Sequence, residues 1–350
     1  MTTRIRLLLA LTLSAATQAL AGTPAGIAIS QAQAEGTAVT AYVAVRDETG
    51  QPVTGIEVGQ LRATLGAQVA EVSSVTPFAE TGEGVLSVLL IDVSRSIDMA
   101  RFERIRQALR DWVAALGERD QVALLTFGST VRTLVAPTAD RAALNAVIET
   151  LAPTDAQTAL HQALAQGLAL GRQRGADLPP RRALVILSDG IDDAPGGMTA
   201  EEVEAQLNEG TMPIYAIGVS RVRDRAAREA GLAALGRLAR RSGGLFSDAG
   251  TADPTAAYAA MRARIRAVER IQISCPGCVA DGNRYRLLIS LTHAGLTLSD
   301  GVDVRLYPPV VAPVPDEPAP PVQHVSETPD ETPAPPADKP QDSQPSSRPA

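Results

Sequence analysis

Two kinds of hydrophobic pattern alternate along the middle of the chain. Continuous apolar runs, typical of buried strands, occupy residues 85–91, 121–127, 183–187 and 214–219. Segments whose apolar residues recur every three or four positions, typical of helices, occupy residues 102–116, 140–151, 159–170, 225–241 and 255–268. Alternation of strands with helices favours a mostly parallel sheet flanked by crossover helices. The pattern therefore predicts an α/β domain over residues 83–267.

One antiparallel strand is expected at an edge of this sheet. Residues 130–136 form a further strand-like run directly after residues 121–127, and only Gly128 and Ser129 separate the two. So short a connection is typical of a hairpin, because a parallel crossover needs a much longer segment.

Strand-like segments also flank the α/β domain on both sides. They lie at residues 37–46, 61–65 and 69–75 before it, and at residues 271–274, 285–291 and 302–307 after it. Each flank has too few strands to form a stable sheet alone. We therefore expect residues 25–82 and 268–307 to pair as the two halves of one small β-sandwich, with the α/β domain inserted between them. Two independent small β units are the alternative.

The N-terminus has the composition of a targeting segment. Arg4 and Arg6 precede an apolar stretch at residues 7–16, and a small-residue pattern ends at Ala21. This order predicts a signal peptide over residues 1–21, with an uncleaved anchor or a buried helix as the alternative. A cleaved signal implies an exported protein, periplasmic or extracellular, and no later segment is apolar enough over about 20 residues to span a membrane.

The composition of the C-terminal segment differs from that of the rest of the chain. Residues 308–350 are dominated by proline, acidic residues and serine, with almost no large apolar side chains. Such a segment buries too little surface to offset its chain entropy, so we expect a disordered tail. It would act as a spacer, or as a docking strand for a proline-reading partner.

Composition narrows the classes of function. With 350 residues, 45% of them hydrophobic, the chain can build more than one core. The formal net charge of −7 argues against a nucleic-acid-binding protein, which normally carries a basic stripe or domain. We therefore expect no nucleic-acid ligand.

Cys275 and Cys278 are the only cysteines, and they stand in a Cys-Pro-Gly-Cys turn. In an exported protein a local disulfide between them is the default. Redox activity would need a helix N-terminus in a thioredoxin-like fold, and the flanking segments here are strand-like. A structural zinc site would need four ligands, and two thiols supply only half of them.

The first candidate metal ligands directly follow the first predicted strand of the α/β domain. Asp92, Ser94 and Ser96 follow the apolar run 85–91, and alternate residues of an extended chain point to the same side. Their oxygens can therefore converge where a parallel sheet usually binds ligands. Carboxylate and hydroxyl oxygens suit Mg²⁺, a hard ion that keeps several waters and is seldom fully enclosed by protein.

Two later residues can complete this set. Thr158 opens the helical pattern 159–170, and Asp189 follows the strand 183–187. Because the carboxyl ends of parallel strands meet at one edge of a sheet, both should lie near Asp92. The sequence therefore predicts a metal site that contains Asp92, Ser94, Ser96, Thr158 and Asp189.

This set resembles the metal-ion-dependent adhesion site of the von Willebrand factor type A family, and the resemblance covers roughly residues 83–267. It implies a Rossmann-like fold. It also implies that Ser94, Ser96 and Thr158 contact a divalent cation, Mg²⁺ or alternatively Mn²⁺ or Ca²⁺, while Asp92 and Asp189 hold it directly or through water. A carboxylate from a protein partner would take the remaining coordination position.

Each residue also has an ordinary structural role to be weighed. Ser96 could be the N-cap of the following helix, because serine is a preferred capping residue. Asp189 with Gly190 could be a simple turn at the end of a strand. Thr154 competes with Thr158, because Ala156 and Gln157 stand where the family often has glycines.

Arg95 departs from the family pattern, which often has a small residue at this position. A side chain that points inward would repel the cation. One that points outward could pair with a carboxylate of the ligand. The sequence leaves both orientations open.

Three functions follow from this reading. The first is an exported, non-enzymatic binding module that captures an acidic side chain through the metal. The second is an envelope scaffold whose site is empty or constitutively filled, and Asp192 and Asp193 would add negative field for cation retention. The third is a metal-dependent hydrolase, which would need a general base such as His161. The sequence contains neither a Gly-x-Ser-x-Gly nor a His-Glu-x-x-His motif.

Overall fold

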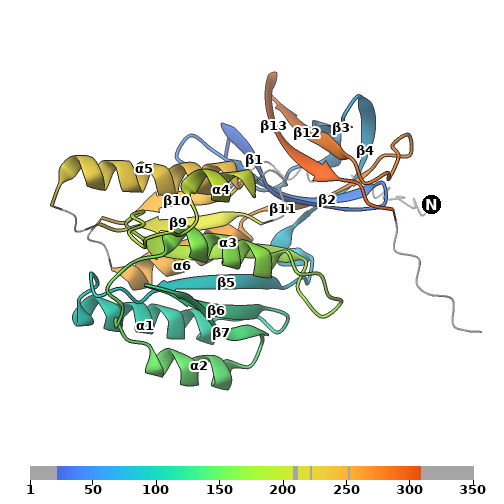
Figure 1. Cartoon of the computed structure of the whole chain (residues 1–350). Helices are drawn as coiled ribbons and strands as arrows, with labels where there is room; N and C mark the ends of the chain where they lie inside the picture. The colour runs from blue at the N-terminus through green and yellow to red at the C-terminus, as the bar shows by residue number, and fades with distance from the viewer. Residues whose placement is uncertain (1–21, 208–211, 221–222, 251–252, 309–350) are drawn as a thin grey trace, which may run out of the picture. The chain divides into compact units, whose positions relative to one another are not determined.

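The computed structural model describes residues 22–207, 212–220, 223–250 and 253–308. The predicted signal peptide and residues 309–350 of the predicted tail lie outside this part of the chain. The described residues form a six-stranded sheet covered by helices and a seven-stranded antiparallel sheet (Figure 1). Among them, no helix is both long and apolar enough to cross a membrane.

The six-stranded sheet has the strand order β10-β9-β8-β5-β6-β7. Its strands are β5 (Val85–Asp92), β6 (Gln121–Phe127), β7 (Val131–Thr138), β8 (Arg181–Ser188), β9 (Ile214–Gly218) and β10 (Leu245–Asp248). All neighbours pair in parallel except β7, which runs antiparallel to β6 after a tight connection. The predicted mixed sheet with one antiparallel edge strand is therefore confirmed, and β10 is a strand that the apolar pattern did not predict.

Helices cover both faces of this sheet. They are α1 (Met99–Ala114), α2 (Arg141–Thr150), α3 (Leu160–Gly171), α4 (Ala200–Ala205), α5 (Arg225–Arg241) and α6 (Pro254–Arg266). Leu89 and Ile91 of β5 pack into the core shared with α1, α2 and α6, whereas Leu86 and Leu90 pack into the core shared with α3, α4 and α5. A strand buried on both faces needs apolar residues at nearly every position, which explains why Ser87 is the only polar residue between Val85 and Ile91.

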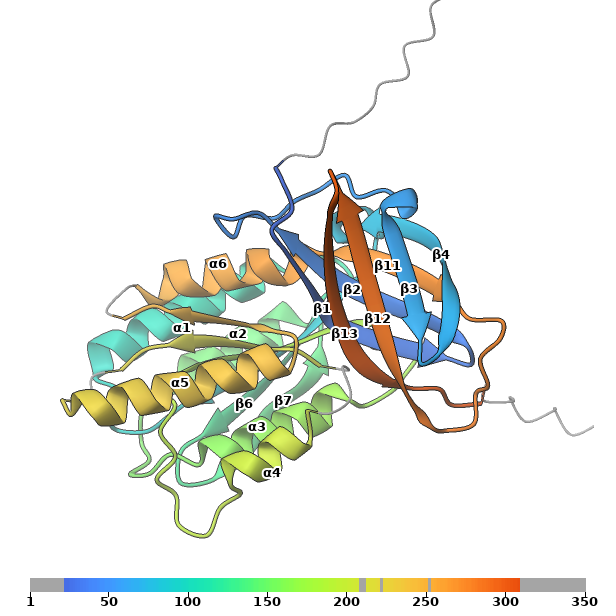
Figure 2. The ribbon, with the colours of Figure 1, turned by 90° about the horizontal axis from the view of Figure 1, so that it is seen from above.

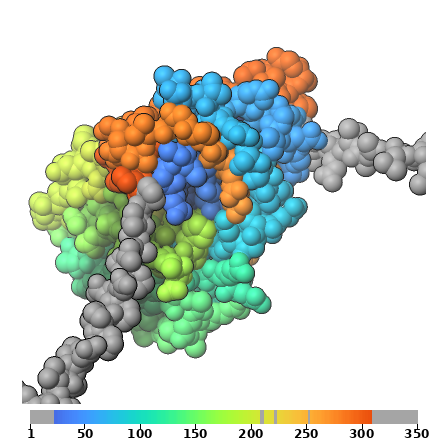
Figure 3. Space-filling model, turned by 90° about the vertical axis from the view of Figure 1, so that its right-hand side faces the viewer, coloured from blue at the N-terminus to red at the C-terminus, as the bar shows by residue number. Residues whose placement is uncertain are grey.

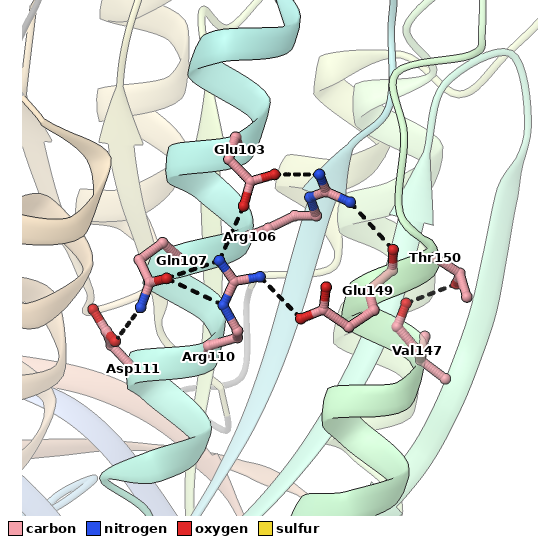
Figure 4. Close-up of polar contacts among 8 residues, drawn as sticks. All are labelled: Glu103, Arg106, Gln107, Arg110, Asp111, Val147, Glu149 and Thr150. Atoms are coloured by element: carbon pink, nitrogen blue, oxygen red, sulfur yellow. Dashed lines mark hydrogen bonds and ion pairs between the residues drawn. The ribbon is translucent and has the colours of Figure 1, made fainter.

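A network of charged side chains joins the outer surfaces of α1 and α2 (Figure 4). The guanidinium of Arg110 lies 3.0 Å from Glu103 and 2.9 Å from Glu149. Glu103 also pairs with Arg106, which donates a 3.2 Å hydrogen bond to the carbonyl of Glu149. Hydrogen bonds from both arginines lower the pKa of Glu103. The pairs are partly exposed, so they fix the position of α2 more than they stabilise the fold.

The second sheet unites strands from both flanks of the chain, with the order β1-β2-β11-β4-β3-β12-β13. Its strands are β1 (Gly26–Glu35), β2 (Ala38–Arg46), β3 (Leu61–Leu65), β4 (Gln68–Pro77), β11 (Glu269–Ser274), β12 (Arg284–His293) and β13 (Leu296–Arg305). Strand β11 lies between β2 and β4, and β12 pairs with β3. The N-terminal and C-terminal flanks therefore form one unit, as the strand count predicted. In the space-filling view, the blue and orange segments lie side by side (Figure 3).

The arrangement of this unit differs from the predicted β-sandwich, because the strands form one sheet that curls until it nearly closes. Strand β4 is continuous, and it pairs with β3 through Gln68–Ala70 and with β11 through Glu71–Pro77. Strands β1 and β13 come together at the ends of the curl (Figure 2), where the amide of Ile29 donates a 2.7 Å hydrogen bond to Asp300. Opposite Gln272 and Ile273 of β11, strand β4 has an extra residue, Ser73, and a bulge of this kind bends a sheet.

A buried polar network links the two sheets. The side-chain oxygen Oε1 of Gln31 accepts hydrogen bonds from the Arg181 side chain (3.1 Å) and the Arg182 backbone amide (2.9 Å), and its side-chain nitrogen Nε2 donates to the Pro180 carbonyl (2.9 Å). Arg181 is fully buried, donates to the Tyr215 hydroxyl (2.8 Å) and stands 5.0 Å from the centre of the Tyr42 ring. These contacts tie the start of β8 to β1 and β2.

The connection between β11 and β12 contains a disulfide. Cys275 and Cys278 are bonded, with their Cα atoms 5.3 Å apart. The predicted local disulfide is therefore confirmed.

Candidate metal centre

The site lies where the strand order of the six-stranded sheet reverses. From β5 the chain continues to β6 on one side, whereas β8 and β9 lie on the other side. The carboxyl ends of β5 and β8 thus flank a topological switch point, which is where open α/β sheets bind ligands. Asp92 is the last residue of β5, and Asp189 directly follows β8.

A cavity of about 230 Å³ opens at this switch point. Asp92, Ser96 and Asp189 line it, so three of the five predicted ligands meet in one pocket, whereas Ser94 and Thr158 are not among its lining residues. Arg101 of α1 also lines the cavity, and the sequence analysis missed this residue. The remaining lining residues come from the same strand ends and from α1: Ile97, Leu187, Ser188 and Val219.

The hydroxyl groups of the first segment are already close together. The Oγ atoms of Ser94 and Ser96 lie 2.8 Å apart, and the amide of Ser94 donates a 2.8 Å hydrogen bond to Oδ1 of Asp92. Ser96 does not cap the following helix, because α1 is capped by Asp98, which accepts a 2.8 Å hydrogen bond from the amide of Arg101. The capping role considered for Ser96 is therefore excluded.

The loop before α3 is fixed against this segment. The amides of Thr154 and Asp155 both donate to the carbonyl of Val93, at 2.9 and 3.0 Å, and the amide of Arg95 donates to the carbonyl of Asp155 at 2.8 Å. Arg95 is exposed and is not among the residues that line the cavity. Thr154 is exposed too, and its hydroxyl donates to its neighbour Asp155, which makes it a weaker candidate ligand than the buried Thr158.

Thr158 is held to the loop that follows Asp189. Its amide donates a 2.6 Å hydrogen bond to Oδ1 of Asp193, and its carbonyl accepts a 3.1 Å hydrogen bond from the amide of Asp193. One turn later, the amide of His161 donates to Asp192 at 2.7 Å, and Nδ1 of His161 lies 3.2 Å from the same carboxylate oxygen. Asp192 and Asp193 therefore position the threonine loop, a role that the sequence analysis did not assign to them.

Asp189 is also part of a turn, as the ordinary interpretation proposed. Its Oδ1 accepts a 3.0 Å hydrogen bond from the amide of Ile191. Gly190 has a φ of +80°, and a Cβ at this position would stand 2.1 Å from the carbonyl oxygen of Gly231 in α5. Only glycine fits there, so the close approach of α5 fixes the path of the chain just after Asp189.

Burial and neighbouring carboxylates disfavour the ionised forms of Asp92 and Asp189. Burial, with smaller contributions from the carboxylates of Asp189 and Asp193, raises the pKa of Asp92 to about 6 against the opposing hydrogen bonds from Ser94. Burial also raises the pKa of Asp189, with a contribution from Asp193. A nearby cation would favour the ionised forms of all three.

The donor set fits a hard divalent cation. In the part of the chain that the structure describes, no group of three or more histidine, cysteine or acidic side chains is placed to hold a metal ion. An ion at this edge would therefore need hydroxyl oxygens among its ligands. Two carboxylates with neutral hydroxyls and water suit Mg²⁺, and Mn²⁺ and Ca²⁺ share its preference for oxygen.

Residues 88–248 match the family model of the von Willebrand factor type A domain. The six-stranded sheet with its flanking helices has this fold. A comparison with curated proteins gives no match.

Solved structures match parts of the chain at low sequence identity, with TM-scores below 0.5. The von Willebrand factor domain of the type V pilus tip protein of Porphyromonas gingivalis is 14% identical, covers 52% of this chain and 95% of its own, and has a TM-score of 0.42. A von Willebrand factor type A protein from Catenulispora acidiphila is 13% identical, with 83% and 73% coverage and a TM-score of 0.43. The protein BatB from Bacteroides thetaiotaomicron is 17% identical, with 53% and 98% coverage and a TM-score of 0.40.

Proposed function

We propose that this protein binds a partner protein by capturing one of its acidic side chains through a divalent cation. Asp92, Ser94, Ser96, Thr158 and Asp189 would hold the cation. Von Willebrand factor type A domains are generally modules for protein interaction or adhesion. The observation that carries the proposal is the shared cavity of Asp92, Ser96 and Asp189 at the switch point of the sheet.

The chemistry of the site favours binding over turnover. A cation bound there would supply a Lewis-acidic position that accepts a carboxylate oxygen. The chain's own residues orient the oxygens: the Ser94 amide fixes the carboxylate of Asp92, and Asp193 fixes the backbone of Thr158. Hydrolysis would additionally need a general base. His161, the nearest histidine in sequence, has its Nδ1 beside the carboxylate of Asp192.

We further propose that the protein is exported to the periplasm or the cell exterior. The Cys275–Cys278 disulfide supports this location, because disulfides persist in oxidising compartments. The tail from residue 308 would serve as a spacer.

The test is capture of a partner from a native cell-envelope extract by immobilised protein in Mg²⁺ and in EDTA. The matched variants are Asp92→Ala and Asp111→Ala, because Asp111 is an exposed aspartate on α1 away from the cavity. We expect capture by wild type and Asp111→Ala in Mg²⁺ only, and none by Asp92→Ala. Equal capture by all three proteins in EDTA would contradict the proposal. Capture by none, with Mg²⁺ still bound, would favour the scaffold function, and Mg²⁺-dependent hydrolysis lost in His161→Ala would favour the enzyme.

A further inference from the structure

A second cavity, of about 160 Å³, lies beside the junction between α6 and β11 and shares no lining residue with the candidate metal centre. Its walls are formed by β2, by residues 52–54, by the start of the 3₁₀ helix η2 (Phe78–Glu80), and by residues 266–269. Most of the lining is apolar and includes Val43, Val45, Val53, Phe78 and Val268. The cavity has room for several water-sized groups.

Glu269 is the acidic residue among these mostly apolar lining residues. It is the first residue of β11 and is only 4% exposed, and within the described residues no hydrogen bond or ion pair reaches its carboxylate, whose oxygens keep some contact with solvent. A buried carboxylate normally has a partner, because removing its charge from water is costly. Asp120 shows the usual case: it is equally buried and accepts hydrogen bonds from the amides of Val85 and Gly117, both at 2.8 Å.

The one cation that lines the cavity is already engaged elsewhere. Nη1 of Arg266 lies 3.0 and 2.9 Å from the two carboxylate oxygens of Asp120, and its guanidinium stands 5.4 Å from the centre of the Phe78 ring. The carboxylate of Glu80 also acts on Glu269 and repels a negative charge there. The cavity therefore combines apolar walls with one negative charge that no positive group balances.

We propose that this cavity is a binding site for a small primary alkylammonium ion. The ammonium group binds the carboxylate of Glu269, and the alkyl chain packs against the valines and Phe78. A ligand of about five heavy atoms, such as n-butylammonium, fits the cavity volume. An ammonium ion supplies both the positive charge and the hydrogen-bond donors that Glu269 lacks.

The same group can come from a free amine or from a lysine side chain of another protein. A free amine fills the cavity from end to end, whereas a lysine side chain must enter with its backbone outside. Nα-acetyl-lysine methylamide presents the lysine side chain alone and therefore separates the two sources.

The test uses the full-length protein and ligand-observed NMR at pH 8, where Glu269 is ionised. The ligands are n-butylammonium, n-butanol and Nα-acetyl-lysine methylamide, and the proteins are wild type, Glu269→Gln and Asp92→Ala. We expect wild type and Asp92→Ala to bind n-butylammonium equally, and Glu269→Gln to bind it at least tenfold more weakly. We expect n-butanol to bind tenfold more weakly than n-butylammonium to wild type, because it has the shape without the charge.

Equal binding of n-butylammonium by wild type and Glu269→Gln, or no binding by wild type, would overturn the proposal and leave a cavity that holds only water. Saturable binding of the lysine derivative would identify a protein side chain as a source. Equal binding of n-butylammonium by wild type and Asp92→Ala would show that this cavity acts independently of the candidate metal centre. Circular dichroism of each variant shows whether it is folded.

Discussion

The hydroxyl oxygens of Ser94 and Ser96 lie 2.8 Å apart at the end of β5, and the amide of Ser94 is bonded to Asp92. This places two neutral oxygens and one carboxylate on one short segment. The remaining predicted ligands arrive from the loops that precede α3 and follow β8. Because Asp193 bonds to the backbone of Thr158, these two loops are themselves connected.

Ser96 should matter for the metal and not for the fold. The N-cap of α1 is Asp98, so Ser96→Ala should change the free energy of unfolding by less than about 0.5 kcal/mol. The same substitution should weaken Mg²⁺ binding about tenfold, measured by isothermal titration calorimetry. Asp98→Ala is the matched control: losing the cap should cost about 1 kcal/mol in urea unfolding. A loss of stability in Ser96→Ala with unchanged Mg²⁺ binding would show that Ser96 acts through the helix.

Asp193 should support the site through the backbone of Thr158. Asp193→Ala removes the acceptor of the 2.6 Å hydrogen bond from the Thr158 amide, so Mg²⁺ affinity should fall about tenfold, as for other groups that orient ligands. Asp193→Asn keeps an oxygen acceptor and should lose less. Equal losses in calorimetry for the two variants would mean that the charge of Asp193 matters, not its hydrogen bond.

The link between the two sheets should depend on Gln31. Gln31→Leu leaves the Arg181 guanidinium, the Arg182 amide and the Pro180 carbonyl each without one partner, so it should destabilise the protein by about 2–4 kcal/mol. Gln33→Leu is the control, because Gln33 makes only one exposed hydrogen bond, to the same carbonyl. It should cost less than about 1 kcal/mol. Urea unfolding measures both, and similar costs would show that the network contributes little.

Glu269 should make stability depend on pH. Burial raises its pKa in the folded protein from 4.5 to about 7, and Glu80 adds to the shift. The folded state therefore holds the proton more tightly than the unfolded state. The free energy of unfolding should be highest below pH 4.5, should fall by roughly 3 kcal/mol as the pH rises past 7, and should then level off as far as this residue is concerned.

Glu269→Gln isolates this contribution, because glutamine has the same shape and does not titrate. The difference in unfolding free energy between the variant and wild type should grow from pH 4.5 to pH 7 in favour of the variant. Urea unfolding at several pH values measures it. Parallel pH profiles would show that Glu269 titrates normally in the folded protein.

Much of the α/β domain was predictable, because its elements are encoded locally. The apolar run of β5 and the helical stripe of α1 both give clear periods, and the helix α5 has the predicted bounds. The meeting of Asp92 with Asp189 was predictable as well, since both follow parallel strands of one sheet. The short strand β10 and the six-residue helix α4 were missed, because so few residues do not establish a period.

What the sequence did not reveal depends on contacts between distant segments. The near closure of the seven-stranded sheet joins Ile29 to Asp300, and no local pattern specifies that pairing instead of a sandwich. The bond between Gln31 and Arg181 is also of this kind. At the site, Arg101 lines the cavity although it lies outside the apolar stripe of α1. The places of these residues depend on how the elements pack together, and secondary-structure propensities do not predict that packing.

Calorimetric titration of Mg²⁺ into wild type and Asp92→Asn at pH 7.5 tests the central claim most directly. Asparagine keeps the oxygen that accepts the Ser94 amide but removes the charge that Asp189 and Asp193 repel. The metal-free variant should therefore be as stable as wild type or more stable. We predict saturable binding of Mg²⁺ to wild type and none to the variant. Equal binding by both proteins, or no binding by wild type, would contradict a metal site at this edge of the sheet.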